Sequence, residues 1–134
     1  MKSFKRISLL SAMFLALSLS TGMALAETQS QAHAESIQAQ IEYNPEKPAK
    51  KILFSTPQYE LILFAFDAGQ GLKGHSVPFS AYIQVIEGEG ILMLEDKAIV
   101  MKAGEGFTLP AGVPHSVKAP ARFKMLLLKQ AGKL

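Results

Sequence analysis

From Lys51 onward the chain consists of short apolar runs separated by turn residues, and this pattern constrains the fold more than any other feature. The runs are Ile52–Ser55, Tyr59–Asp67, Phe79–Glu87, Ile91–Leu94, Ala98–Met101, Gly106–Leu109, His115–Lys118 and Arg122–Lys129. Gly, Pro or charged residues separate them, for example at Asp67–Gly74, Gly88-Glu89-Gly90 and Pro110–Pro114. Such punctuation predicts strands and turns. We therefore expect an all-β domain whose antiparallel sheets close or fold on each other, because closure removes exposed strand edges.

The first 26 residues have the composition of a secretory signal peptide. Three basic residues among residues 1–6 precede an apolar stretch, residues 7–26, which ends in Ala-Leu-Ala. We expect cleavage after Ala26 and a periplasmic or secreted mature protein. A retained membrane anchor is the alternative, because residues 7–25 are nearly long enough to span a bilayer. Several Ser and Thr residues dilute this stretch and no basic cluster follows it, so we favour cleavage and no stable membrane anchor.

The charge of the mature chain argues against a nucleic-acid partner. The whole sequence has 14 Lys and Arg against 11 Asp and Glu. Three of the basic residues lie within residues 1–26, which leaves 14 − 3 = 11 basic residues against 11 acidic ones. A basic surface for phosphate backbones is not expected from a formally neutral domain. The chain has no Cys, which suits an oxidising compartment.

Residues 27–50 differ in composition from the region that follows. They are rich in Gln, Ser, Ala and Glu and contain Pro45 and Pro48. We interpret them as a flexible linker with a short helical piece around residues 35–41. His33, within it, is expected to be solvated. The predicted organisation is a signal peptide at 1–26, a linker at 27–50 and a β domain at 51–134.

The run Phe79–Glu87 shows which residues share a face. Side chains alternate between the two faces of a strand. One face is apolar, with Phe79, Ala81, Ile83 and Val85. The other is half apolar, with Ser80, Tyr82, Gln84 and Ile86. We expect a second sheet or a second subunit to cover this half-apolar face, and a homodimer would do so.

The segment from Gly69 to Ala119 resembles the two motifs of the cupin superfamily. The first motif has a Gly, a His-x-His pair, a Glu and a final Gly at fixed spacings. Gly69, His75 and Gly88 match it, whereas Val77 and Ala81 stand where the second His and the Glu are expected. The glycines suit tight turns, where positive φ favours Gly.

The second motif has a Gly, a Pro-x-Gly, a His and an Asn. Gly104, Pro110, Gly112 and His115 match its spacing, and Ala119 replaces the Asn. The resemblance implies a single antiparallel cupin β-barrel of jelly-roll type. It also implies that His75 and His115 converge at one mouth of the barrel, in a pocket shared with Val77 and Ala81.

The resemblance also raises the question of a metal. Members with the full set use three His and one Glu to bind a divalent transition metal. Here only His75 and His115 remain, and two imidazoles alone bind metal weakly. Tyr59, Tyr82, Gln84 and Glu87 are the candidates for a third ligand, and none has a convincing position in the sequence pattern. A weakly held Fe, Ni, Mn or Zn ion is left open as a cofactor.

Three functions are compatible with this pattern. The first is a binding module that holds a small organic molecule, such as a carbonyl or carboxylate compound, between His75 and His115 in a mostly apolar pocket. The second is an enzyme of isomerase, lyase or dioxygenase type, with a weakly held metal or with one His as general base. The third is a structural or interaction protein with a vestigial pocket. The fold does not choose among them.

Overall fold

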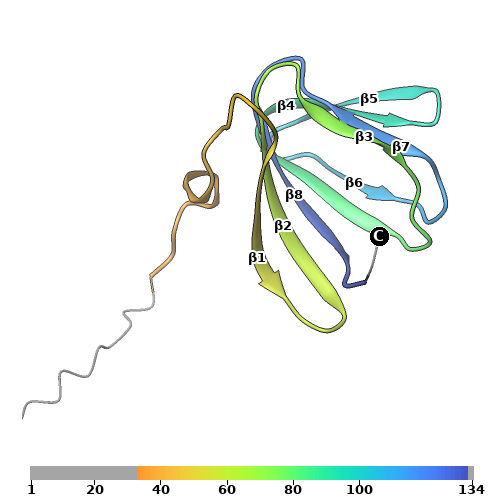
Figure 1. Cartoon of the computed structure of the whole chain (residues 1–134), viewed down its shortest axis with the longest axis horizontal. Helices are drawn as coiled ribbons and strands as arrows, with labels where there is room; N and C mark the ends of the chain where they lie inside the picture. The colour runs from red at the N-terminus through yellow and green to blue at the C-terminus, as the bar shows by residue number, and fades with distance from the viewer. Residues whose placement is uncertain (1–32, 133–134) are drawn as a thin grey trace, which may run out of the picture. The chain divides into compact units, whose positions relative to one another are not determined.

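The computed structural model describes residues 33–132, which form a curled, all-β domain (Figure 1). A short 3-10 helix, η1 (Ile37–Gln40), precedes eight strands. The strands are β1 (Ala49–Ser55), β2 (Tyr59–Phe66), β3 (Gly71–His75), β4 (Ala81–Leu94), β5 (Lys97–Lys102), β6 (Gly106–Leu109), β7 (His115–Lys118) and β8 (Phe123–Gln130). No helix in this part of the chain has the length and apolar character needed to cross a membrane. The expected signal peptide and its cleavage point lie outside the described residues.

Two antiparallel sheets share the long strand β4. The first half of β4 pairs with β8 and β6, and β2 and β1 extend that sheet beyond β8. The second half of β4 pairs with β5 and β7, and β3 lies beyond β7. The antiparallel cupin-type barrel expected from the sequence is confirmed. Its strand order runs from β1 to β3, and these two strands stand at the two ends of that order (Figure 1).

The turn expected at Gly88-Glu89-Gly90 is wrong, because β4 continues through it. A register shift between Val85 and Glu87 bends the strand there, and Gly88 has a φ of 73°. A Cβ atom at Gly88 would collide with the carbonyl oxygen of Arg122. Gly88 therefore marks a bulge rather than a chain reversal, and bulges commonly redirect a strand in this way.

The loop expected at Asp67–Gly74 is also partly wrong, because it contains β3. Three glycines in this segment suggested a turn. At one of them, Gly71, a Cβ would collide with the backbone carbonyl of Val117 on β7. Glycine here permits close approach of two strands, which is one of its recognised uses within a strand.

The core fills the inside of the curled sheets. From β2 it receives Ile62, Phe64 and Phe66, which alternate with residues of the opposite face. The ring of Phe66 stacks on that of Phe64, with centroids 5.7 Å apart, and on that of Phe123, 4.8 Å apart. Ala81, Ile83 and Val85, further members of the core, were expected on one apolar face. Burial of these side chains is the main stabilising contribution to the domain.

The outer face of β2 is covered by the chain's own segment 33–48, which lies within the region expected to be a linker. Ile41 is 7% exposed and packs with Leu63 and Ala65, both fully buried. Ile86 of β4 packs against the same cluster. The half-apolar face of β4 is therefore covered at Ile86 by this segment, whereas Tyr82 on that face remains exposed.

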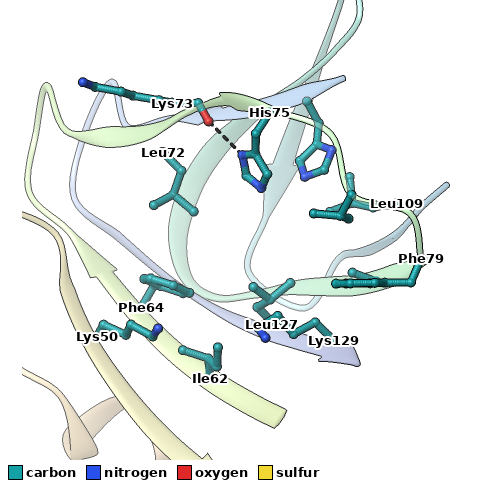
Figure 2. Close-up of a pocket in the computed structure, with 13 residues that line it drawn as sticks. Lys50, Ile62, Phe64, Leu72, Lys73, His75, Phe79, Leu109, Leu127 and Lys129 are labelled. Atoms are coloured by element: carbon teal, nitrogen blue, oxygen red, sulfur yellow. Dashed lines mark hydrogen bonds between the residues drawn. The ribbon is translucent and has the colours of Figure 1, made fainter. Parts of the chain in front are cut away.

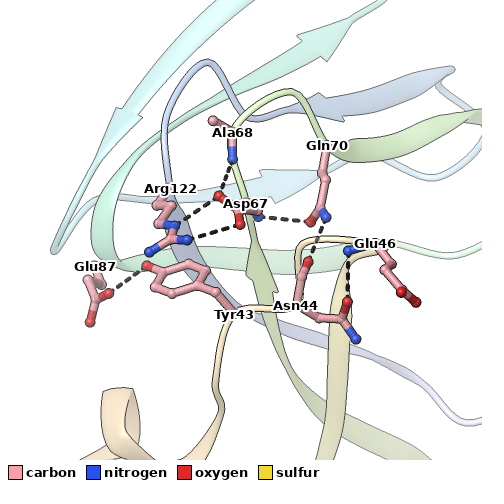
Figure 3. A network of polar contacts seen from close by, with 8 residues as sticks. All are labelled: Tyr43, Asn44, Glu46, Asp67, Ala68, Gln70, Glu87 and Arg122. Atoms are coloured by element: carbon pink, nitrogen blue, oxygen red, sulfur yellow. Dashed lines mark hydrogen bonds and ion pairs between the residues drawn. The ribbon is translucent and has the colours of Figure 1, made fainter.

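Polar contacts tie the same segment to the barrel (Figure 3). The Tyr43 hydroxyl donates a 2.5 Å hydrogen bond to Glu87, and burial together with this carboxylate raises the pKa of Tyr43. Arg122 lies over the Tyr43 ring and forms two hydrogen bonds to Asp67. The Gln70 amide donates to the Asn44 carbonyl. These contacts fix residues 43 and 44 beside the end of β2.

Candidate functional site

Strand pairing brings His75 and His115 together. His75 ends β3, His115 begins β7, and the two residues are register partners across this antiparallel pair. Directly opposed residues lie close enough for their side chains to touch. The ring centroids are 4.6 Å apart and the rings are tilted by 57°. His115 is 8% exposed, whereas His75 lies at the surface. His115 therefore lies inside the barrel and His75 lies at its mouth.

Both imidazoles are oriented by the backbone. Nδ1 of His75 lies 3.0 Å from the Lys73 carbonyl oxygen (Figure 2). Nδ1 of His115 lies 2.9 Å from the Val113 carbonyl oxygen. A carbonyl oxygen only accepts hydrogen bonds, so each Nδ1 carries a proton and donates it. In the neutral ring, Nε2 is then the acceptor. Each histidine thus offers an Nε2 lone pair to a ligand.

Val77 and Ala81 lie in the same pocket as the two histidines. Each is 7% exposed. The Val77 carbonyl accepts a 2.7 Å hydrogen bond from the Gly112 backbone N–H, and Gly112 has a φ of 74°. This contact ties the loop before β7 to the segment before β4. The structure thus brings together all four residues that the sequence placed in one pocket.

The pocket is a cavity of about 240 Å³ with a mainly apolar wall. This volume is below the range of about 300–1,000 Å³ for typical ligand pockets, so a ligand must be small. The apolar lining comprises Ile62, Phe64, Leu72, Val77, Phe79, Ala81, Leu109 and Leu127. A smaller recess of about 40 Å³ also borders both histidines. Such a wall suits the hydrocarbon part of an organic molecule.

Three lysines complete the lining, and none of the lining residues is acidic. Lys50 and Lys129 lie at the end of the pocket away from His75, whereas the Lys73 side chain extends outward (Figure 2). Lys129 is 8% exposed, and its Nζ lies 2.9 Å from a carboxylate oxygen of Glu60. The hydrogen bond from Lys129, with the charge of Lys50, lowers the pKa of Glu60. Two ammonium groups therefore face one ionised carboxylate.

The residues present do not form the four-ligand metal centre of family members with the full set. Among residues 33–132, no three His, Cys, Asp or Glu side chains are grouped so that they could hold a metal ion. Buried Val77 and Ala81 occupy the two missing positions and have no donor atom. The candidate third ligands lie elsewhere. Glu87 contacts Tyr43 and Lys124, and Tyr59 and Tyr82 line a separate hollow. Gln84 is not among the residues that line the histidine pocket.

Sequence reasoning missed the lysines and most of the apolar wall. For Lys129 a signal was present, because it shares the strand face of Phe123, Met125 and Leu127, which point into the barrel. For Lys50 no comparable signal existed, since it lay in the expected linker. A lysine on an otherwise apolar strand face is informative, because Lys is rarely buried without a partner.

Comparisons with known proteins agree with the fold. Residues 62–128 match the family described as "Cupin domain". A cupin superfamily protein from Desulfitobacterium hafniense has a TM-score of 0.71 and 20% identity, covering 76% of this chain and 94% of that one. A conserved Streptococcus pyogenes protein of unknown function has a TM-score of 0.69 and 21% identity, covering 77% and 90%. These likenesses support the fold.

A third structure is more similar in sequence. The cupin 2 conserved barrel domain protein from Leptotrichia buccalis is 33% identical, with a TM-score of 0.65, and the match covers 69% of this chain and 45% of that one. Among curated proteins, none matches this sequence. The family match covers half of the chain and lies across both histidine positions. The protein is a member of the cupin domain family.

Proposed function

We propose that the barrel pocket binds a small organic molecule between His75 and His115. The observation that carries this proposal is the orientation of the two rings, which both leave Nε2 free to accept a hydrogen bond inside one mainly apolar cavity. Small-molecule sites commonly combine an apolar wall with a few polar groups that fix the ligand's orientation. The replacement of two ligand positions by Val77 and Ala81 adds apolar surface to that wall.

A thermal-shift screen with small carboxylates, carbonyl compounds and phenols tests this proposal. Binding to the folded state raises the unfolding temperature by mass action. At least one compound should stabilise the wild type, and His75→Ala and His115→Ala should each remove the shift. His33→Ala is the matched control, because His33 lies outside the pocket lining. Loss of the shift in the His33 variant, or its persistence in both pocket variants, contradicts the proposal.

Metal analysis separates this function from a metal-dependent cupin enzyme. The purified protein should contain no stoichiometric Fe, Ni, Mn or Zn after growth in supplemented medium. A stoichiometric metal that disappears in His75→Ala and in His115→Ala would instead support the enzyme. The result does not depend on knowing the substrate.

We further propose that the chain acts outside the cytoplasm after removal of residues 1–26. The basic start, apolar stretch and Ala-Leu-Ala end of this segment support export. Cell fractionation and N-terminal sequencing test it together. A mature protein that begins at Glu27 in the exported fraction is expected, and an intact N-terminus in the cytosolic fraction would contradict export.

A further inference from the structure

We infer that the ligand of this pocket is a small carboxylate that also carries a hydroxyl group, with its carboxylate at Lys50 and Lys129 and its hydroxyl at the histidines. This inference rests on the proposed function, since it specifies the ligand of the same pocket. It follows from the placement of unlike polar groups at two ends of an apolar cavity (Figure 2).

The lysine end has an excess of positive charge. Lys50 and Lys129 contribute two ammonium groups, and Glu60 neutralises one of them. Lys129 is held within an apolar strand face, where water screens charge less than at an exposed site. An anion bound there neutralises the remaining positive charge, whereas a neutral group does not.

Lys129 also has a hydrogen-bond donor to spare. Its ammonium group has three N–H donors. Within the described residues, one reaches Glu60 at 2.9 Å and one reaches the Gln130 carbonyl oxygen at 3.2 Å. The third can be donated to a ligand oxygen. Lys50 has no ion pair at salt-bridge distance within the same part of the chain. A carboxylate has enough acceptor sites for both ammonium groups.

The histidine end selects a donor. Both Nδ1 protons are already donated to backbone carbonyls, so the neutral rings present Nε2 as acceptors. A hydroxyl group can donate there, whereas a second carboxylate would only add another acceptor. Between the two ends, Phe64, Leu72 and Leu127 form an apolar wall that suits an aromatic ring or a short hydrocarbon chain.

Isothermal titration with three probes of increasing length tests the inference: 4-hydroxybenzoate, 4-hydroxyphenylacetate and 3-(4-hydroxyphenyl)propanoate. Each acid is compared with its primary amide, which has similar shape and no charge. At least one acid should bind about tenfold more tightly than its amide, equivalent to about 1.4 kcal/mol. The same acid without the hydroxyl should bind more weakly, and His115→Ala should abolish that difference.

Two variants with opposite expected effects test the role of charge. Lys50→Met should weaken binding of the acid about fivefold and leave binding of the amide unchanged. Glu60→Gln should tighten binding of the acid, because it releases the Lys129 ammonium from its partner. A gain in affinity cannot arise from misfolding. Lys51→Met is the matched control, because Lys51 neighbours Lys50 on β1 and is not in the pocket lining.

The outcomes distinguish this inference from the function on which it rests. Equal affinity for acids and amides, lost in the histidine variants, would overturn the carboxylate assignment and leave the binding function intact. Acid binding that neither Lys50→Met nor Glu60→Gln alters would also overturn it. If no acid binds, the inference is wrong, and the broader thermal-shift screen then decides whether the pocket binds any small molecule.

Discussion

Replacement of Ile41 by alanine tests whether segment 33–48 is part of the folded domain. Ile41 is 7% exposed and packs against Leu63 and Ala65 on the outer face of β2. The substitution removes about three buried carbon groups, each contributing about 0.8 kcal/mol. Comparable Ile-to-Ala changes in cores cost about 2–5 kcal/mol. Because a segment at the surface can partly close the cavity, we expect a loss of about 2–3 kcal/mol.

Urea unfolding followed by circular dichroism measures this loss. For a small domain the free energy of unfolding falls by about 1–3 kcal/mol per molar urea, so a loss of about 2–3 kcal/mol should lower the midpoint by about 0.7–3 M with an unchanged slope. The control is Ile52→Ala on β1, because Ile52 is 50% exposed. We expect it to cost less than about 1 kcal/mol, within the range of strand propensities.

The reasoning would be refuted if both variants shifted the midpoint equally, or if Ile41→Ala left it unchanged. A flexible linker predicts no effect at Ile41, because a side chain that is solvated in both states contributes nothing to their difference. The measurement therefore separates the packed segment from the linker expected from its composition.

Three further perturbations have outcomes that follow from the contacts. Gly71→Ala should lower the thermal midpoint strongly, because the new Cβ meets the Val117 backbone carbonyl, whereas Gly132→Ala, with open space around it, should not. Because the pKa of Tyr43 is raised in the folded state, its hydroxyl keeps its proton there at a pH where the unfolded chain has lost it. The free energy of unfolding should therefore fall as the pH rises above 10.0, the usual pKa of tyrosine, and this fall should be smaller in Tyr43→Phe. The hydrogen bond from Arg122 lowers the pKa of Asp67 in the folded state below its usual value of 3.8. The ionised Asp67 therefore stabilises the domain above pH 3.8, and this contribution should be lost as the pH falls further. In Asp67→Asn, the free energy of unfolding should decrease less on acidification.

The faces of the strands could be predicted from sequence because alternation is a local property. Ala81, Ile83 and Val85 point into the core as their spacing indicated. Segment 33–48 was harder, because its polar composition conceals a few well-placed apolar side chains such as Ile41. The run of apolar residues in β2 was the signal for this packing. A strand with apolar residues on both faces is typically buried on both sides, so a segment of the chain or a partner was needed to cover the outer face of β2.

Strand β3 could not be recognised because its glycines serve a distant contact. A glycine in a turn and a glycine under a neighbouring backbone look alike in one sequence. The clash that a Cβ at Gly71 would make involves Val117, which is far away in the chain. The motif spacing nevertheless placed His75 beside His115, although it did not identify β3 as a strand. In the structure the two residues are register partners across β3 and β7.

The excess charge of the pocket bears on how the proposed ligand would lie. A site with a divalent cation and one Glu, as the resemblance implies for full members of the family, carries a net charge of +1 beside the histidines. Here Lys50, Lys129 and Glu60 also sum to +1, but at the opposite wall. Both kinds of site therefore carry a net positive charge that attracts an anion, but here that charge lies at the wall opposite the histidines. A carboxylate drawn to this wall directs the rest of its molecule toward the histidines, the reverse of a carboxylate bound to a metal at the histidine end. A crystal structure with the tightest-binding acid should therefore show the carboxylate nearer to Lys129 than to His115, and the opposite orientation would refute this account of the charge.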